Sequence, residues 1–265
     1  MIKNISKIEE NYRNNLLFTI KKIFNEGSQK LEKRFKLDNN GEQCVKGHSS
    51  LIDKILKLVL LKSSKNLNLK KNKSICLIAV GGYGREELAP KSDIDILFLT
   101  PKIKSKSIKD LIQYILYLLW DVGFSLGHST RSVNEVLYDS KTDITIRTSL
   151  LDRRYIEGNI NLYKELESQF KVFQKKSIPD FIKLKLLEWE IRHLKMGGSR
   201  YMLEPNIKEG KGALRDLHTL FWIAKYAYGI NNFLEIKKIN INWKSELKRF
   251  IRAQNFLWSI RCHLH

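Results

Sequence analysis

Long apolar runs are missing from this chain of 265 residues. Its most apolar stretch, residues 111–120, is flanked by Lys109, Asp110 and Asp121, so it falls short of the ~18 to 20 residues that a membrane span needs. The first ten residues, Met-Ile-Lys-Asn-Ile-Ser-Lys-Ile-Glu-Glu, lack the apolar core and the small-residue cleavage site of a secretory signal. The sequence therefore predicts a soluble protein with no membrane partner.

Cysteine is scarce as well. Cys44, Cys76 and Cys262 lie far apart in the chain, so neither a disulfide framework nor a zinc site with closely paired ligands is indicated. A reducing compartment fits this pattern best, and we expect a cytoplasmic protein.

Acidic residues are the third shortage, because 28 Asp and Glu stand against 48 Lys and Arg, a formal net charge of +20. Such a surplus suits nucleic-acid binding, since cations neutralise phosphates and release counterions. However, 35 of the 48 cations are Lys, and many lie in loops such as residues 62–73 and 101–109, where a solvated surface explains them. We expect no nucleic-acid partner, and a non-catalytic basic RNA-binding or scaffold protein is the alternative.

The N-terminal part is predicted to be helical. Its first 26 residues contain no Gly or Pro and repeat apolar side chains at near-helical spacing, which indicates one or two helices. Residues 37–48 are predicted as a loop, after which Ser49 or Ser50 is expected to cap a helix that starts at residue 51.

Short apolar runs alternating with amphipathic segments then predict a mixed domain. Strands are expected at residues 75–80, 94–100, 123–130 and 148–155, with a helix at 107–120 and a short helix or turn from residue 144 before the last strand. Ser107 with Asp110, and Ser132 with Glu135, have the spacing of capping boxes that open helices.

From about residue 159 the pattern becomes helical throughout. Helices are expected at residues 162–173, 178–194, 214–228 and 243–265, with a glycine-containing break at 197–212. The last helix reaches the end of the chain without a capping glycine, so the chain is predicted to stop inside an element. The predicted organisation is N-terminal helices over residues 1–72, a mixed domain over 73–158 and a truncated helical domain over 159–265.

A glycine cluster directly follows the first predicted strand. Gly81, Gly82 and Gly84 allow backbone N–H groups to approach a ligand closely, and successive N–H groups suit phosphate oxygens. The alternative is that these glycines only provide unusual backbone angles.

Two carboxylates begin the next strand. Side chains two residues apart on a strand point to the same face, so Asp93 and Asp95 project together while Ile94 and Ile96 enter the core. Converging carboxylate oxygens suit Mg²⁺, which also takes substrate phosphates as ligands. The alternative is a strand end where both carboxylates face water.

The order of these motifs resembles the PII uridylyltransferase family of the DNA polymerase β nucleotidyltransferase superfamily. The matching motifs are Gly81-Gly82, a ten-residue gap and Asp93-Ile94-Asp95; Leu126-Gly127-His128-Ser129-Thr130-Arg131; Thr148-Ser149-Leu150-Leu151-Asp152-Arg153-Arg154; and Leu203-Glu204-Pro205-Asn206-Ile207-Lys208-Glu209-Gly210-Lys211-Gly212-Ala213-Leu214-Arg215-Asp216-Leu217. The resemblance spans about residue 75 to the C-terminus. It implies an α+β fold, in which a polymerase-β-like nucleotidyltransferase domain with a mixed sheet and flanking helices precedes an all-helical, incomplete domain.

The resemblance also implies an activity, the transfer of UMP from UTP to a tyrosine hydroxyl of the nitrogen-signalling protein PII. Two Mg²⁺ ions would be held by Asp93 and Asp95, with Asp152 as the third catalytic carboxylate on a neighbouring strand. The alternative for Asp152 is a salt bridge to Arg153 or Arg154. An adenylyltransferase that acts on glutamine synthetase is a further alternative, because UTP rather than ATP rests on the resemblance alone.

The cations near these motifs are expected to bind the nucleotide. The resemblance and the chemistry of the side chains assign Arg85, Ser92, Lys208 and Arg215 to it, together with the glycines Gly81, Gly82 and Gly84. Arg85 could equally pair with Glu86 or Glu87, and Ser92 could cap a turn.

Members of the family continue into an HD domain that removes UMP and into ACT domains that sense glutamine. Neither is expected in this chain, and the activity of the chain alone is left open.

Overall fold

The computed structural model describes residues 2–66, 75–103, 105–195, 206–230, 235 and 244–264, without the side chains of residues 2–9 and 244–245. Three parts of the predicted organisation lie outside the described residues. They are residues 67–73 of the lysine-rich loop, residues 197–205 of the glycine-containing break and Trp243 at the start of the last predicted helix.

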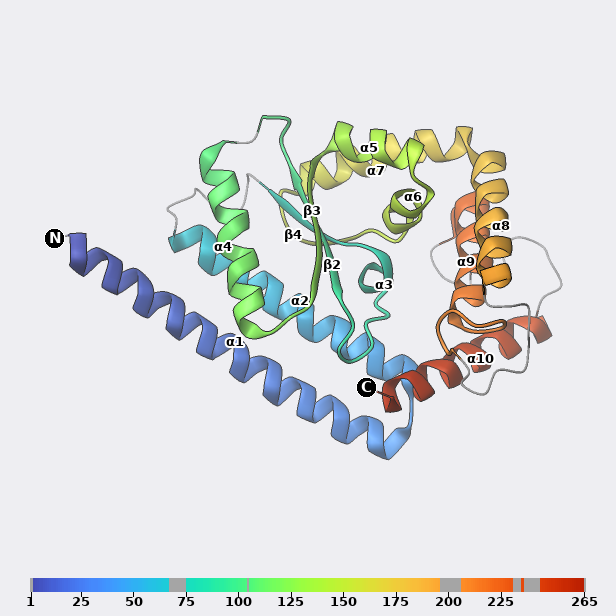
Figure 1. The fold of residues 1–265 in the computed structure, drawn as a ribbon, viewed down its shortest axis with the longest axis horizontal. Helices are drawn as coiled ribbons and strands as arrows, with labels where there is room; N and C mark the ends of the chain where they lie inside the picture. The colour runs from blue at the N-terminus through green and yellow to red at the C-terminus, as the bar shows by residue number, and fades with distance from the viewer. Residues whose placement is uncertain are drawn as a thin grey trace.

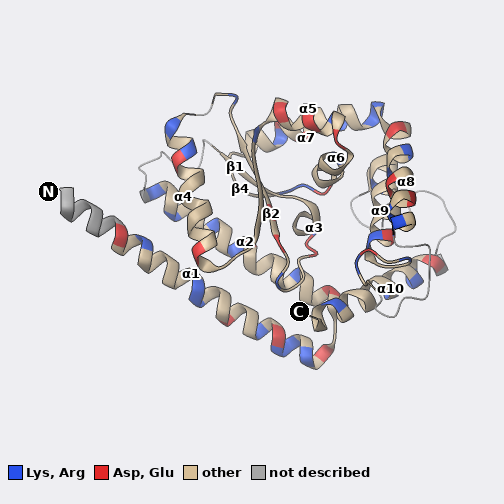
Figure 2. Cartoon of the chain, in the orientation of Figure 1, with Lys and Arg blue, Asp and Glu red and all other residues tan. Residues whose placement is uncertain are grey.

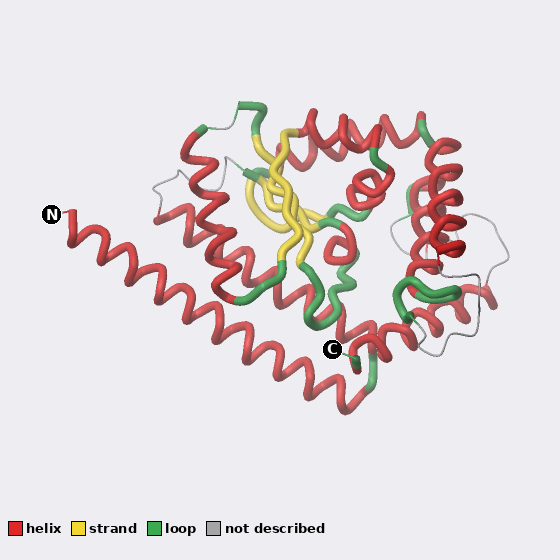
Figure 3. The backbone as a smooth tube through the Cα atoms, viewed as in Figure 1, coloured by secondary structure: helices red, strands yellow, loops and turns green. Residues whose placement is uncertain are grey.

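A mixed sheet forms the centre of the molecule (Figure 1). Its strands are β1 (Cys76–Ala79), β2 (Ile94–Thr100), β3 (Leu126–Ser132) and β4 (Arg154–Gly158), in the order β3-β2-β1-β4. β1 pairs antiparallel with both β2 and β4, whereas β2 and β3 run parallel. Helices flank this sheet on both sides (Figure 3). The α+β fold with a mixed sheet and flanking helices is confirmed.

The described helices occur in three groups. Two helices precede the first strand in the chain, α1 (Ile2–Asp38) and α2 (Gly41–Asn66). Four helices connect the strands along the chain, α3 (Gly81–Gly84), α4 (Lys106–Val122), α5 (Val133–Thr142) and α6 (Ile144–Leu151). Four described helices follow the last strand, α7 (Ile160–Lys176), α8 (Ile178–Lys195), α9 (Leu214–Tyr228) and α10 (Lys244–His263). No described helix is both long enough and apolar enough to cross a membrane.

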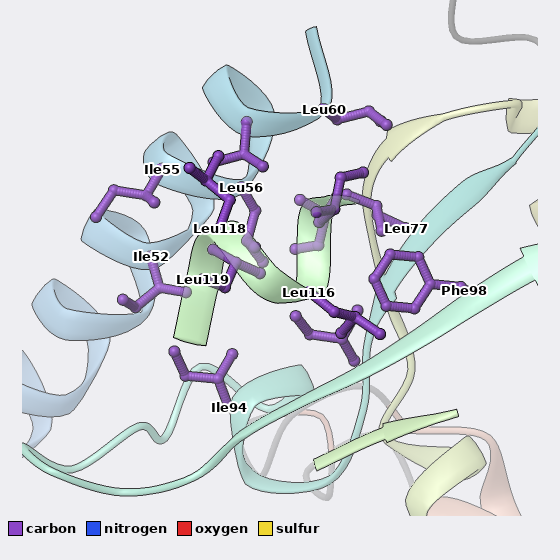
Figure 4. Packing of buried hydrophobic residues seen from close by; sticks show 14 of the residues in the cluster. Ile52, Ile55, Leu56, Leu60, Leu77, Ile94, Phe98, Leu116, Leu118 and Leu119 are labelled. Carbon is purple, nitrogen blue, oxygen red and sulfur yellow. The ribbon is translucent and has the colours of Figure 1, made fainter. Parts of the chain in front are cut away.

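The sheet buries both of its faces. Leu77, Ile96 and Phe98 pack under α1, α2 and α4. Figure 4 shows Leu77 and Phe98 beside the labelled side chains of α2 and α4. On the opposite face Ile78 and Leu97 pack against α5, α6, α7 and α9. Because side chains alternate along β2, Asp95 lies on the face of Leu97, which is the side of the later helices.

The N-terminal helices differ from their prediction at their junction. The predicted loop over residues 37–48 is wrong, because α2 already begins at Gly41 and continues through Ser49. Asn40 caps this helix, accepting a hydrogen bond from the N–H of Gln43 through its side chain at 3.1 Å. A Cβ on Gly41 would lie 2.2 Å from the backbone nitrogen of Ser259 in α10, so a distant helix packs here and the glycine marks that contact.

The predicted strand over residues 148–155 is also wrong in its first half. Residues 144–151 form α6, and the strand begins only at Arg154. Asp143 caps α6 by accepting from the N–H groups of Thr145 and Ile146 at 2.6 and 3.1 Å. Capping therefore overrides the strand preference of the β-branched residues in this segment.

The predicted caps of the two crossover helices have different outcomes. Ser132 and Glu135 form the expected capping box of α5. The helix predicted from Ser107 instead begins at Lys106, and Ser105 is its cap.

Positive charge is not gathered on one face of the described chain. Figure 2 shows Lys and Arg spread along most of the helices, which fits a solvated surface better than a nucleic-acid groove.

Candidate active site

A cavity of about 770 Å³ lies between the start of β2, the turn of α3 and the helices α8, α9 and α10. Its lining includes almost every site residue predicted from the sequence, namely Gly81, Gly82, Arg85, Ser92, Asp93, Asp95, Asp152, Lys208 and Arg215. Gly84 is the exception. The fold therefore brings together groups that are more than 130 residues apart in the sequence.

The glycine cluster forms the single turn of α3 rather than a free loop. Gly81 has a φ of +58°, a backbone angle that L side chains rarely adopt. A Cβ at this position would lie 3.2 Å from Oδ2 of Asp95. Gly81 thus allows the positive φ of this turn and also leaves room for the Asp95 carboxylate.

Gly84 has a different role from the other two glycines. It is buried, and a Cβ there would lie 2.0 Å from the carbonyl oxygen of Asp152 and 2.9 Å from that of Ala79. The structure places Gly84 below the cavity, where the backbone of α3 packs directly on the end of α6.

We expect Gly84→Ala to lower the free energy of unfolding by about 1 to 3 kcal/mol or more, because backbone atoms must move to admit the methyl group. Gly82→Ala is the matched control, since its nearest atom, the carbonyl oxygen of Glu87, would lie at an ordinary 3.7 Å. Urea unfolding of the two variants measures the difference. Equal stability would contradict the packing role of Gly84.

Asp93 and Asp95 lie at the start of β2 and face the cavity. Asp93 is exposed and accepts a hydrogen bond from the hydroxyl of Ser125 at 2.5 Å. Asp95 is partly buried, and burial together with the charge of Asp93 raises the pKa of its carboxyl, while Lys208 and Arg85 oppose the rise. The two carboxylates are crowded, as expected of groups that share a cation.

The donor set fits a divalent cation that also binds substrate. No group of three or more Asp, Glu, His or Cys suited to a metal occurs among the described residues. Mg²⁺ commonly takes only one or two carboxylates and completes its shell with phosphates and water. Asp93 and Asp95 are therefore suited to hold Mg²⁺ in company with a nucleotide.

Asp152 is held in a buried polar network. Its carboxylate accepts from Arg85 Nη1 at 2.5 Å, from Trp222 Nε1 at 2.7 Å and from Lys225 Nζ at 3.3 Å. Its side chain is 0% exposed, and it caps the C-terminal end of α6 instead of standing on a strand. In this structure its oxygens are bound by two cations and an indole, and the predicted alternative partner Arg154 bonds to Asp53 at 2.6 Å.

Arg85 links this network to Glu87. Its Nε donates to Glu87 at 2.7 Å, and His218 Nε2 lies 2.9 Å from the same carboxylate oxygen. Burial favours the neutral form of Glu87, but Arg85 and His218 outweigh it and lower the pKa of Glu87 to about 2. Burial and the charge of Arg85 lower the pKa of His218. The predicted pairing of Arg85 with Glu87 is thus present at the cavity wall.

The remaining predicted residues lie around the cavity. Lys208 is exposed, and Arg215 pairs with Glu209 at 3.1 Å. Ser92 accepts a hydrogen bond from Arg261 Nη2 at 3.2 Å. Cations from the later, helical part of the chain therefore line the same cavity as the two carboxylates of β2.

Sequence reasoning missed several residues of this site. Lys185 is buried, with its ammonium 2.7 Å from Glu188 and 4.4 Å from the centre of the Trp222 ring, and burial lowers its pKa. Trp222 lies in the core, and its indole N–H also reaches Asp152. The only sequence signal was the spacing of His218, Trp222 and Lys225 on one side of a predicted helix.

The fold and site define a nucleotidyltransferase domain, and the family model of that description matches residues 61–183. A second family model, GlnD PII-uridylyltransferase, matches residues 180–265. The chain belongs to the PII uridylyltransferase family, as its motifs predicted.

Two curated relatives extend this similarity over nearly the whole chain. The bifunctional uridylyltransferase/uridylyl-removing enzyme of Rhodospirillum rubrum is 40% identical over 259 residues, covering 96% of this chain and 28% of the relative. The enzyme of the same name from Azospirillum brasilense is 40% identical over 255 residues, covering 94% of this chain and 27% of the relative. The chain thus spans little more than a quarter of the length of these relatives.

Proposed function

We propose that this chain is a nucleotidyltransferase that transfers UMP from UTP to a tyrosine hydroxyl of a PII signalling protein in the cytoplasm, with release of pyrophosphate. The observation that carries the proposal is the Asp93 and Asp95 pair facing a cation-lined cavity of about 770 Å³. The two relatives are uridylyltransferase/uridylyl-removing enzymes by name, which supports uridylyl transfer.

In the proposed mechanism Asp93 and Asp95 would hold two Mg²⁺ ions. Such ions supply charge neutralisation on the triphosphate and favour in-line attack by the hydroxyl. Lys208, Arg215 and Ser92 line the same cavity and bind phosphate oxygens, and Arg85 adds positive charge at the cavity wall. Pre-placed cations of this kind stabilise developing negative charge without costly rearrangement.

Asp152 remains the predicted third carboxylate of this mechanism. To ligate a metal or accept the proton of the tyrosine, it must exchange at least one of its bonds to Arg85, Trp222 or Lys225.

The proposal is tested by incubating the chain with Mg²⁺, a PII protein and UTP labelled at the α-phosphate. We expect label on PII, with ATP as a poor substitute, and no label on a PII variant whose acceptor tyrosine is Phe. The Rhodospirillum rubrum relative serves as the positive control. Labelling from ATP in preference to UTP, or of glutamine synthetase in place of PII, would assign the chain to protein adenylylation.

A further inference from the structure

The strand β3 lies directly beside the carboxylate pair of β2. The two strands are parallel, and Ile94 is opposite Leu126 while Asp95 is opposite Gly127. The N–H of Ile94 donates to the carbonyl of Ser125 at 2.9 Å, which fixes this register at the end where the carboxylates stand. Ser125, directly before β3, and Gly127, within it, therefore lie against Asp93 and Asp95.

Ser125 restrains Asp93. Its hydroxyl donates to Oδ1 of Asp93 at 2.5 Å. Asp93 is exposed, and an exposed aspartate without such a bond samples several rotamers. The hydroxyl leaves the second carboxylate oxygen of Asp93 available for a cation.

Gly127 makes room for Asp95. A Cβ on Gly127 would lie 2.2 Å from Oδ1 of Asp95 and 3.4 Å from its Cγ. Gly127 lies within a regular strand and its φ is outside the left-handed region, in contrast to Gly81 and Gly123. The local backbone therefore does not require glycine here, and the missing side chain is explained by the Asp95 carboxylate.

We propose that Ser125 and Gly127 are positioning residues that hold the two carboxylates in the arrangement that binds a divalent cation. The inference rests on the proposed function, because it takes Asp93 and Asp95 as the metal ligands. Residues that orient metal ligands typically change metal affinity by 10-fold to 100-fold when they are replaced.

The test measures Mn²⁺ binding by electron paramagnetic resonance in the presence of inorganic tripolyphosphate, which carries no base or ribose. Gly127→Ala and Ser125→Ala should each weaken Mn²⁺ binding by roughly 10-fold to 100-fold. Ser125→Thr, which keeps the hydroxyl, should bind Mn²⁺ nearly as the unaltered chain does. This rescue separates a positioning role from a general loss of packing.

Two control variants account for unrelated losses of stability. Gly229→Ala places a side chain at a φ of +68° with no atom within 4 Å of the new Cβ, so it strains the backbone at a residue outside the cavity lining. Ser168→Ala removes an exposed hydroxyl that bonds only to the Glu165 carbonyl of its own helix. Both should leave Mn²⁺ binding unchanged.

Mn²⁺ affinity unchanged in both Gly127→Ala and Ser125→Ala would overturn the inference, as would equal losses in Ser125→Ala and Ser125→Thr. If Gly127→Ala does not fold, the two Ser125 variants still decide the outcome. Because tripolyphosphate has no base, a chain that binds Mn²⁺ as expected but transfers no UMP contradicts the proposed function and supports the roles of Ser125 and Gly127.

Discussion

Asp95→Asn should reduce uridylyl transfer by roughly 10²-fold to 10⁴-fold, because a bound metal stabilises the transition state by several kcal/mol and each ~1.4 kcal/mol is a factor of ten. The amide keeps the size of the carboxylate but loses the charge that holds Mg²⁺. The measurement is the initial rate of PII labelling at saturating UTP. Asp110→Asn on the exposed side of α4 is the control, and its rate should not change.

The same variant should also alter the dependence of stability on pH. The pKa of Asp95 is raised in the folded state by burial and by the charge of Asp93. The protonated form thus favours folding, and that contribution is present below the unfolded pKa and is lost as pH rises through the raised folded pKa. Without metal, Asp95→Asn should be at least as stable as the unaltered chain at neutral pH and should not show this loss. Addition of Mg²⁺ with tripolyphosphate should then raise the melting temperature of the unaltered chain only.

An Asp95→Asn variant with an unchanged rate of uridylyl transfer would contradict the proposed function directly. A variant that is both inactive and much less stable would assign Asp95 to the fold instead of to the metal. The paired measurement of rate and melting temperature separates these outcomes.

Asp152→Ala should lower the free energy of unfolding by about 3 to 5 kcal/mol, the usual cost of breaking a buried ion pair by removing one partner. Arg85 would keep its ion pair with Glu87, while Lys225 and the indole N–H of Trp222 would each lose the hydrogen bond to Asp152. Asp139→Ala is the control, because its pair with Arg131 is solvent-exposed and is worth about 0 to 1 kcal/mol. Urea unfolding of both variants makes the comparison.

Asp152→Asn then separates the structural role of this residue from its predicted role as a metal ligand. Asn keeps an oxygen for Trp222 but removes the charge that pairs with Arg85 and Lys225. If Asp152 ligates the metal, Mn²⁺ affinity with tripolyphosphate should fall as far as it does in Asp95→Asn. If it acts through Arg85, stability should fall while Mn²⁺ affinity is largely retained. Asp152→Ala with unchanged stability would contradict the network as described.

The carboxylate pair shows how much of the site was predictable. The two-residue period of a strand places Asp93 and Asp95 on one face, and their neighbours Ile94 and Ile96 are buried as the same period requires. The glycine cluster before them was read as one functional unit, yet only Gly81 and Gly82 line the cavity. Gly84 differs because its contacts come from Asp152, which is distant in sequence.

The errors in the predicted fold have a common origin. The junction of α1 and α2 was assigned by its polar composition, but the side chain of Asn40 and the packing of α10 on Gly41 start the second helix early. The β-branched residues of α6 favour a strand, but the cap at Asp143 and the bonds of Arg147 to the carbonyls of Ser140 and Lys141 stabilise a helix. Propensity is a weak preference of a few tenths of a kcal/mol per residue, which such contacts exceed.

The sequence by itself determined the mixed fold class, the helical second half, the family and the two carboxylates beside a glycine turn, because each depends on local periodicity or on spacing within a short segment. Only the tertiary structure decided the partners of Asp152, which are Arg85 and Trp222, 67 and 70 residues away. It alone placed Lys208 and Arg215 in the same cavity as Asp95, and it alone brought Ser125 and Gly127 against the carboxylates. The physical reason is that burial and charge pairing depend on which surfaces meet in space, and sequence distance does not record that.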